Sequence, residues 1–301
     1  MTESLIYKRS DLAEVIPNIW GQRYNDYFKA SLIGAGFFTD RSGELAGGGD
    51  VLYTPVYSAM TANTKTQQSE VTLQQADPTK VTLTVQTHKE VSFMIEDIDA
   101  ARIKASYVTM DAQAKNGGYE VGASLESAIF ALFSGFTGSV GASTTALADS
   151  EILSAIAQLE TNKVSNIFGG DVAFFMHPTV FWTQVQALDK FSVNNLTPTQ
   201  DPVAHKPVGK LYGIPVYTSP YISYISGSAG RNNALAHKDS IHFATLGLGS
   251  GGSKGSFTGS AGVRVQANYI PEYLATLVTA DIVYGVIENR DEAGILIKTK
   301  A

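Results

Sequence analysis

The residue types that could carry out chemistry lie first in a glycine-rich passage near residue 250. Gly247, Gly249 and Gly252 have the spacing of a dinucleotide-binding loop, and 251–255 (GGSKG) has that of a hydrolase nucleophile elbow. Both motifs need a strand before them and a helix after them, because only then do backbone amides or the serine meet the substrate. Here the chain continues into Gly, Ser and Thr without helical periodicity. We interpret both matches as low-complexity coincidences.

The histidines and carboxylates do not form a recognisable catalytic or metal-binding motif. No pair of histidines has the HxxxH or HExxH spacing suited to zinc; the five are His88, His177, His205, His237 and His242. His237 and His242 flank a predicted strand, where core or surface roles are favoured. The chain has no cysteine, which excludes disulfides and thiolate metal sites. We therefore expect no catalytic residue, no metal site and no cofactor.

Composition indicates a folded protein without a membrane span. The 301 residues are enough for two domains, or for one domain with large extensions. The N-terminus carries charges where a signal peptide would be apolar, and the most apolar window, 269–287, is interrupted by Pro271, Glu272 and Asp281. The formal charge of −6 disfavours a role in reading nucleic-acid sequence. We expect synthesis and folding in a cytoplasm, and no membrane partner.

A long helix is the element that must position the rest. Small or apolar residues recur in steps of three and four between Met110 and Leu132, which places them on one helix face. A helix continuous from Ala105 to Phe133 would be about 43 Å long, long enough to cross a domain. Gly117 and Gly118 interrupt it, and a close backbone contact or a bend is expected there.

Strand periodicity precedes this helix and suggests an extension from the body. Apolar residues alternate with polar ones at Val51 and Tyr53, at Val71 and Leu73, and twice more between 81 and 95. The tip between them, 58–69 (SAMTANTKTQQS), is small and polar. An isolated hairpin is marginally stable in water, so this one must lie either on its own body or on another molecule.

The two ends of the chain carry further candidate contacts. Trp20, Tyr24 and Phe28 form an aromatic cluster near the N-terminus, which must pack on this subunit or on a neighbour. Near the other end, the turn 288–294 crowds Glu288, Arg290, Asp291 and Glu292 between two strands. This turn is either a solvated hairpin tip or a charge-complementary contact with another copy.

The order of these parts resembles that of the major capsid (coat) proteins of tailed bacteriophages, which have the Hong Kong 97-type fold. The segments that carry the resemblance are 94–101 (MIEDIDAA), 209–217 (GKLYGIPVY), 234–243 (ALAHKDSIHF) and 281–285 (DIVYG). Each segment alone has low specificity for this family, and the resemblance rests on the order of the four segments along the chain. The resemblance covers nearly the whole chain and implies an α+β fold with a spine helix, peripheral and axial domains, an extended β-loop and an N-terminal arm.

The resemblance also implies a division of the chain and a set of partners. The segments would be an N-terminal arm at 1–46, the extended β-loop and its base at 47–94, the peripheral domain with the spine helix at 95–145, the axial domain at 146–262, and the closing strands and tip loop of the peripheral domain at 263–301. Such proteins form hexamers and pentamers of themselves, close an icosahedral shell around double-stranded DNA held non-specifically, and become part of the virion.

Several partners and contacts stay open at this point. No built-in scaffolding segment is visible before the extended loop, so a separate scaffolding protein and a portal are expected partners. Relatives that cross-link their subunits use a lysine on the loop, and Lys65 stands near the loop tip here without an identifiable partner. An encapsulin-like nanocompartment would have the same fold with an enzyme cargo. An α+β hydrolase is the remote alternative, and it would need a clustered Ser, His and acid.

Overall fold

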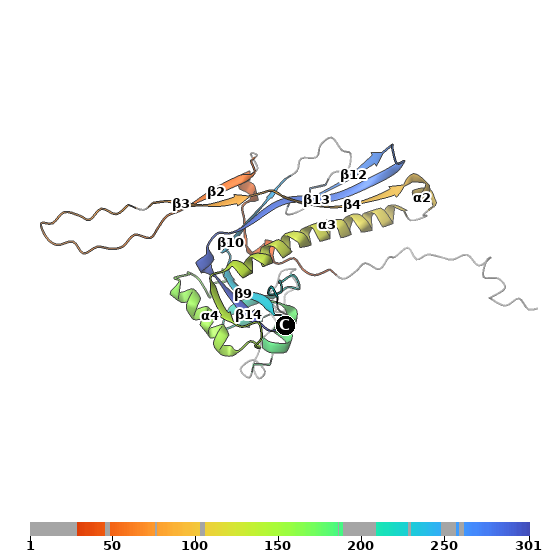
Figure 1. The fold of residues 1–301 in the computed structure, drawn as a ribbon. Coiled ribbons are helices and arrows are strands. Elements are labelled where there is room, and N and C mark those ends of the chain that lie inside the picture. Colours follow the sequence, from red (N-terminus) through yellow and green to blue (C-terminus); the bar gives the residue numbers. More distant parts are fainter. Residues whose placement is uncertain are drawn as a thin grey trace, which may run out of the picture.

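The computed structural model describes residues 29–45, 49–75, 77–102, 106–185, 187–188, 209–227, 230–247, 257–258 and 262–301. These residues form an elongated molecule with a compact part attached near its middle (Figure 1). One six-stranded sheet and a long helix make up the elongated part, which we call the long lobe. A second six-stranded sheet makes up the compact part, which we call the compact lobe.

The first sheet is assembled around one long strand. Its strands are β1 (Thr39–Asp40), β4 (Thr87–Glu96), β10 (Ile241–Leu246), β11 (Phe257–Thr258), β12 (Arg264–Ile270) and β13 (Ala275–Glu288). β13 is antiparallel to β10, β12 and β4. Val283 and Tyr284 pair with both β10 and β4, so these two strands lie on opposite sides of β13. The period-two pattern between residues 81 and 95 correctly predicted β4.

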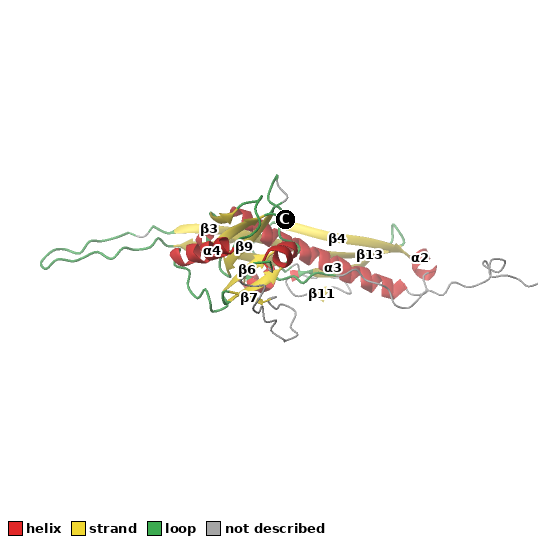
Figure 2. Cartoon of the chain, turned by 90° about the horizontal axis from the view of Figure 1, so that it is seen from below, coloured by secondary structure: helices red, strands yellow, loops and turns green. Residues whose placement is uncertain are grey.

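The predicted long helix is present and crosses the long lobe. It is α3 (Ser106–Ala131), about 39 Å long, preceded by α2 (Asp97–Arg102) and followed by the 3-10 turn η2 (Leu132–Gly135). α3 lies against β4 and β13 (Figures 1 and 2). The close contact expected at the two glycines is found at Gly117, where an added Cβ would lie 3.5 Å from both Ala280 Cβ and Val91 Cγ1.

The compact lobe is closed by a strand from the far end of the chain. The second sheet has the order β5 (Gly138–Gly141), β14 (Gly294–Thr299), β9 (Arg231–His237), β6 (Val172–Met176), β8 (Ile214–Thr218) and β7 (Gly209–Leu211). Its helices are α4 (Asp149–Thr161) and α5 (Pro178–Val180), which continues as a π-helical turn (Phe181–Val185). All five residues of β6 are buried because both faces of this sheet are covered.

The two lobes share one hydrophobic core. Alternate residues of β6 point to opposite faces: Phe174 packs in the core beneath α4, and Phe175 packs in the core that includes the C-terminal half of α3. Phe133 of η2 lies 5.7 Å from Phe175 between ring centroids, and Phe38 stacks on the same ring at 5.2 Å. Truncating a buried aromatic of this kind costs about 3–5 kcal/mol, so this cluster fixes how the lobes meet.

The predicted hairpin is shorter than its sequence pattern suggested. β2 (Val51–Val56) pairs with β3 (Thr79–Thr84), and the loop 57–78 between them projects from the body (Figure 1). The expected strand at Val71 and Leu73 is wrong within one chain, because no strand pairing reaches these residues. β4, which was expected to be part of the same excursion, belongs instead to the first sheet.

The predicted segments also interleave between the lobes. β10 comes from the segment 146–262 but pairs in the first sheet, and β14 comes from 263–301 but pairs in the second. Alternation along a sequence identifies a strand but not the sheet it joins, because the partner is chosen by long-range packing. The 146–262 and 263–301 boundaries therefore do not coincide with the sheets at these two strands.

A buried carboxylate ties three strands of the first sheet together. Asp281 on β13 accepts hydrogen bonds from Arg264 Nε at 2.9 Å and Arg264 Nη2 at 2.6 Å, and lies 3.0 Å from Nε2 of His88 on β4. Burial by itself would raise the pKa of Asp281, but the bonds from Arg264 and His88 outweigh it, and the pKa is lowered.

We expect Asp281→Asn to destabilise the subunit by about 2–3 kcal/mol at pH 7, because bonds to a charged acceptor are lost. A lowered pKa in the folded state means that this stability is present above the ordinary Asp pKa and is lost as the pH falls through the folded value. The difference from wild type should therefore shrink on acidification below about pH 4. Urea unfolding at several pH values measures it, with Glu96→Gln on exposed β4 as control. A difference that does not change with pH would contradict the assignment.

Candidate contact surfaces

The loop 57–78 presents apolar and polar side chains to solvent without a body beneath them. Tyr57, Met60, Val71 and Leu73 are exposed, and so is Lys65, the lysine expected near the tip. The two arms of the loop are joined where the Gln74 side chain bonds both backbone groups of Thr61. At the base, Lys80 Nζ lies 4.5 Å from the Tyr53 ring centroid. The loop thus holds a defined path with little burial of its own.

Residues 30–35, which lead into the body from the N-terminal side, are held along α3 by hydrogen bonds. Tyr119 Oη donates to the carbonyl of Ala30 at 2.8 Å. About two turns further on, the Glu126 carboxylate accepts from the backbone N–H groups of Ile33 at 2.7 Å, Gly34 at 2.8 Å and Ala35 at 3.4 Å. These amides open the short helix α1 (Gly34–Phe37). Trp20, Tyr24 and Phe28, the predicted aromatic anchors, lie outside the described residues.

The turn 288–294 connects the two lobes and is not a hairpin tip. β13 ends at Glu288 in the first sheet, a 3-10 turn η5 (Asp291–Ala293) follows, and β14 begins at Gly294 in the second sheet. The two flanking strands do not pair with each other, so the expectation of a closing hairpin is wrong. Its acids and its arginine therefore stand at the junction of the lobes.

The four predicted side chains of this turn have different surroundings. Asp291 is used within the chain, because its carboxylate accepts from Thr137 N at 2.7 Å and from the Thr137 hydroxyl. Glu288 is half-buried against Gly135, and burial, with the nearby charge of Asp291, raises its pKa. Arg290 and Glu292 are exposed. Of the predicted set, these two present their charges outward.

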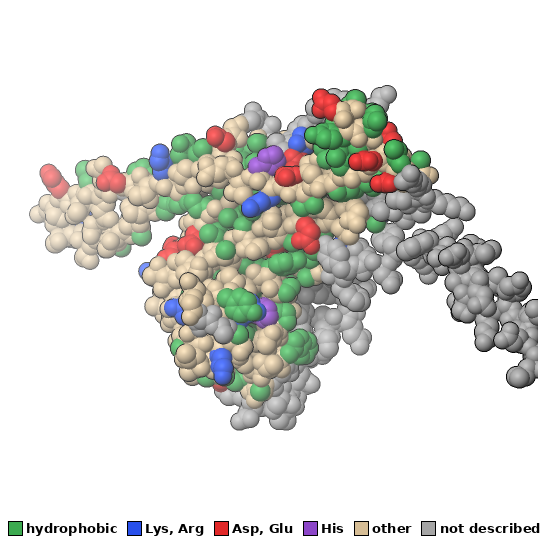
Figure 3. Space-filling model, turned by 45° about the vertical axis from the view of Figure 1, so that its right-hand side comes forward, with side chains coloured by type: hydrophobic (Ala, Val, Ile, Leu, Met, Phe, Trp, Pro, Cys, Tyr) green, Lys and Arg blue, Asp and Glu red, His purple; other side chains and the backbone are tan. Residues whose placement is uncertain are grey.

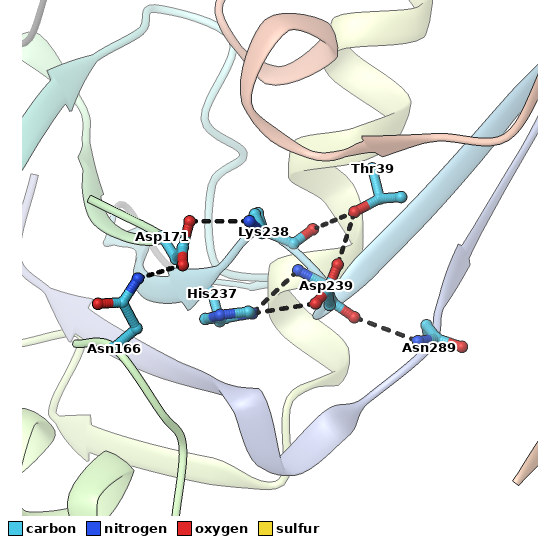
Figure 4. A network of polar contacts seen from close by, with 7 residues as sticks. All are labelled: Thr39, Asn166, Asp171, His237, Lys238, Asp239 and Asn289. Atoms are coloured by element: carbon cyan, nitrogen blue, oxygen red, sulfur yellow. Dashed lines mark hydrogen bonds and ion pairs between the residues drawn. The ribbon is translucent and has the colours of Figure 1, made fainter. Parts of the chain in front are cut away.

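A polar network beside this turn joins the lobes through the β9–β10 connection (Figure 4). Lys238 Nζ donates to Asp171 at 2.8 Å, and Thr39 Oγ1 donates to Asp239 at 2.8 Å. Asp239 N donates to His237 Nδ1 at 3.1 Å, so that ring nitrogen is unprotonated, and burial lowers the pKa of His237. The network binds strands from both sheets and the 29–45 segment together.

This network contains a histidine, an acid and a neighbouring serine, but not the arrangement of a hydrolase. Ser240 follows Asp239 directly, yet its hydroxyl is buried and makes no hydrogen bond to a described residue, His237 included, so His237 does not activate it. Within the described residues no group of three His, Asp or Glu side chains could hold a metal ion. One groove of about 340 Å³ lies near the turn, and polar side chains such as Gln158, Asn162 and Asp291 line it.

An exposed apolar patch lies at the far end of the long lobe, and sequence reasoning missed it. It comprises Met94, Ile98, Tyr269, Tyr273 and Leu274, which we call the tip patch. Acidic residues of β4, α2 and the β12–β13 turn surround it: Glu96, Asp97, Asp99 and Glu272. Figure 3 shows green and red side chains gathered at this end. Its two segments are joined by Tyr269 Oη donating to Asp97 at 2.8 Å.

No helix in the described parts of the chain is both long and apolar enough to cross a membrane. No family model and no curated protein sequence matches the chain.

Solved structures match it over nearly its whole length. A structure from Mycobacterium phage Che8 aligns with a TM-score of 0.69 at 15% identity, covering 94% of this chain and 96% of that one. The asymmetric unit of the mature capsid of bacteriophage PhiM1 gives 0.68 at 13% identity, covering 94% and 91%. The capsid of a native GTA particle gives 0.69 at 11% identity, covering 99% and 100%. The chain has the fold of these structures, and the α+β resemblance to phage capsid proteins is confirmed at the level of fold.

Proposed function

We propose that this chain is the major capsid protein of a tailed bacteriophage, a structural subunit that self-assembles into hexamers and pentamers and closes an icosahedral shell around packaged double-stranded DNA. The observation that carries the proposal is the fold likeness to capsid subunits over 91–100% of both chains, with no large part of either left over. The chain would belong to the virion and be assembled in the host cytoplasm.

The shape of the subunit favours an assembled form over a monomer. The loop 57–78 and the tip patch expose apolar side chains at two ends of the molecule, where a monomer gains nothing from them. Extended elements that bury surface only on another copy are the means by which subunits of a shell hold one another. In this proposal the long lobe is the peripheral domain and the compact lobe is the axial domain.

Electron microscopy of the purified full chain tests the proposal. Closed shells, or rings of five and six subunits when no scaffolding protein is supplied, are the expected result. A protein that stays monomeric at high concentration, with and without a candidate scaffolding protein, would contradict it. Shells that enclose a single enzyme in fixed proportion, and no nucleic acid, would favour the nanocompartment alternative.

Arg290 is proposed to pair with a carboxylate of a neighbouring copy, because it is exposed in a turn that carries three acids. Arg290→Glu should leave subunit stability within about 0.5 kcal/mol, since the side chain is on the surface. Particle yield at physiological salt should fall several-fold, because a buried carboxylate left without its partner costs about 3–5 kcal/mol. Arg290→Lys, which keeps the charge, is the matched control. Equal yields for the two variants would sink the idea.

A further inference from the structure

Strand β4 has one edge without a partner strand in the described parts of the chain. It pairs with β13 along its whole length, and no other backbone hydrogen bond reaches residues 87–96 there. In Figure 2 it runs along a margin of the long lobe. Proteins usually protect open edges by short length, proline or charge. β4 has ten residues and no proline, and its stretch 91–95 (VSFMI), which lies between Glu90 and Glu96, carries no charge.

The side of β4 that faces α3 is incompletely covered. Val91 contacts the helix near Gly117, and Phe93 and Ile95 alternate with it, so the three lie on this side. Val91 nevertheless remains 37% exposed, and Phe93 and Ile95 are only half-buried. Val91, Phe93 and Ile95 therefore form an apolar strip beside α3 that ends at the open edge of β4. A further strand at this edge would cover it.

The loop contains a segment, residues 70–75, that has the pattern of a strand but no strand to pair with. Residues 70–75 (EVTLQQ) have strand periodicity, but none of their backbone groups bonds to another backbone group in the described chain. Val71 is 63% exposed and Leu73 is 88% exposed. A segment patterned as a strand with no strand to pair with is complete only when a partner edge is supplied.

The open edge of β4 and residues 70–75 cannot pair with each other within one molecule. The loop leaves the β2–β3 hairpin in the direction opposite to that in which β4 runs toward α2 (Figures 1 and 2). We propose that residues 70–75 of a second copy of this chain add to the outer edge of β4 as a further strand. This deepens the proposed function, on which it rests for the supply of neighbouring copies, by naming the surface that receives the loop and the way in which it binds.

Two alignments set Val71 and Leu73 opposite Val91 and Phe93, and the charges favour the antiparallel one of these two. An antiparallel strand with Leu73 opposite Val91 and Val71 opposite Phe93 extends the apolar strip beside α3. It places Glu70 opposite Met94 and Gln74 opposite Glu90. A parallel strand with Val71 opposite Val91 would set Glu70 against Glu90, and like charges directly opposite each other destabilise a sheet. The antiparallel alignment is therefore the one that we carry to experiment.

Disulfide trapping tests this alignment cleanly because the chain has no cysteine of its own. Cβ atoms of directly opposite residues in an antiparallel pair lie about 4.5–5.5 Å apart, close to what a disulfide spans. Assembled particles of the Leu73→Cys, Val91→Cys double variant should give covalently linked chains after mild oxidation. Leu73→Cys with Ser92→Cys is the matched control, since Ser92 points to the other face of the sheet and should link at least tenfold less.

Each outcome bears on one claim. Shells that form normally but give no 73–91 link, or link 92 equally well, overturn the strand addition and leave the proposed function standing. A link from Val91→Cys to a cysteine placed within residues 1–28 instead would assign the edge to the N-terminal segment and also overturn it. If the wild-type chain forms neither shells nor rings, the proposed function itself fails. Hydrogen exchange of unmodified subunits is the second measurement: those amides of residues 89–94 that point to the outer edge, away from β13, should exchange at least tenfold more slowly in shells than in free subunits.

Discussion

Deleting residues 59–68 will leave a folded, soluble subunit that forms few or no closed shells. The deleted residues are exposed and none belongs to a core cluster, so subunit stability should change little. Shortening the loop by about half changes its closure entropy by only about 0.5 kcal/mol. In the proposed function, by contrast, assembly would lose the element that reaches a neighbour, and the loss would recur in every copy of the subunit.

The measurement compares thermal melting of the subunit with particle yield by sedimentation and electron microscopy. A variant in which 59–68 is replaced by Gly and Ser of equal length is the matched control, because it keeps the reach of the loop and removes its side chains. A yield restored by this control would assign the role to loop length and not to its tip. Normal shells from the deletion itself would refute the role of the loop in assembly.

Glu126→Ala will destabilise the subunit by about 3 kcal/mol or more. The Glu126 side chain is 1% exposed and accepts from the amides of Ile33, Gly34 and Ala35. Removing the acceptor strands these donors in the interior, and each stranded group costs about 1–3 kcal/mol. The segment 29–38 should then detach from α3.

Urea unfolding and hydrogen exchange at residues 33–35 measure this effect. Glu126→Gln keeps the size of the side chain but turns an N–H₂ group toward backbone N–H groups, so its loss should be intermediate. Ser127→Ala, one residue along on the exposed face, should stay within about 0.5 kcal/mol. If Glu126→Ala were as stable as Ser127→Ala, the carboxylate would not be what holds residues 33–35 against α3.

Elements with strong periodicity could be predicted from sequence because their pattern is local. The helix face at Val121, Leu125 and Ile129 is buried as expected. Glu126 lies among the polar residues that separate the apolar positions of α3, and nothing in its neighbourhood distinguishes a carboxylate that caps a segment 92 residues earlier in the chain. A long-range polar contact leaves no periodic signal.

The candidate surfaces depended on information that one chain does not contain. Val71 and Leu73 alternate as a strand should, but the strand assignment needs a pairing edge that the described part of this molecule does not offer them. The turn 288–294 was read as a hairpin tip because strands flank it, whereas those strands enter different sheets. Residues 94–98 and 269–274 come together in the tip patch only because β4 pairs with β13 in its particular register. This pairing is long-range and leaves no local signal in the sequence.

The place of β14 in the second sheet has a consequence for the order of events during synthesis. β14 lies between β5 and β9, and it is the only strand in the described chain that pairs with β5. The compact lobe therefore cannot close until residue 299 has left the ribosome, more than 150 residues after β5 was made. A nascent or prematurely terminated chain has an open lobe with Leu235 and Phe174 uncovered, which exposes it to chaperones and proteases. In the proposed function, such a requirement would keep incomplete subunits out of the growing shell.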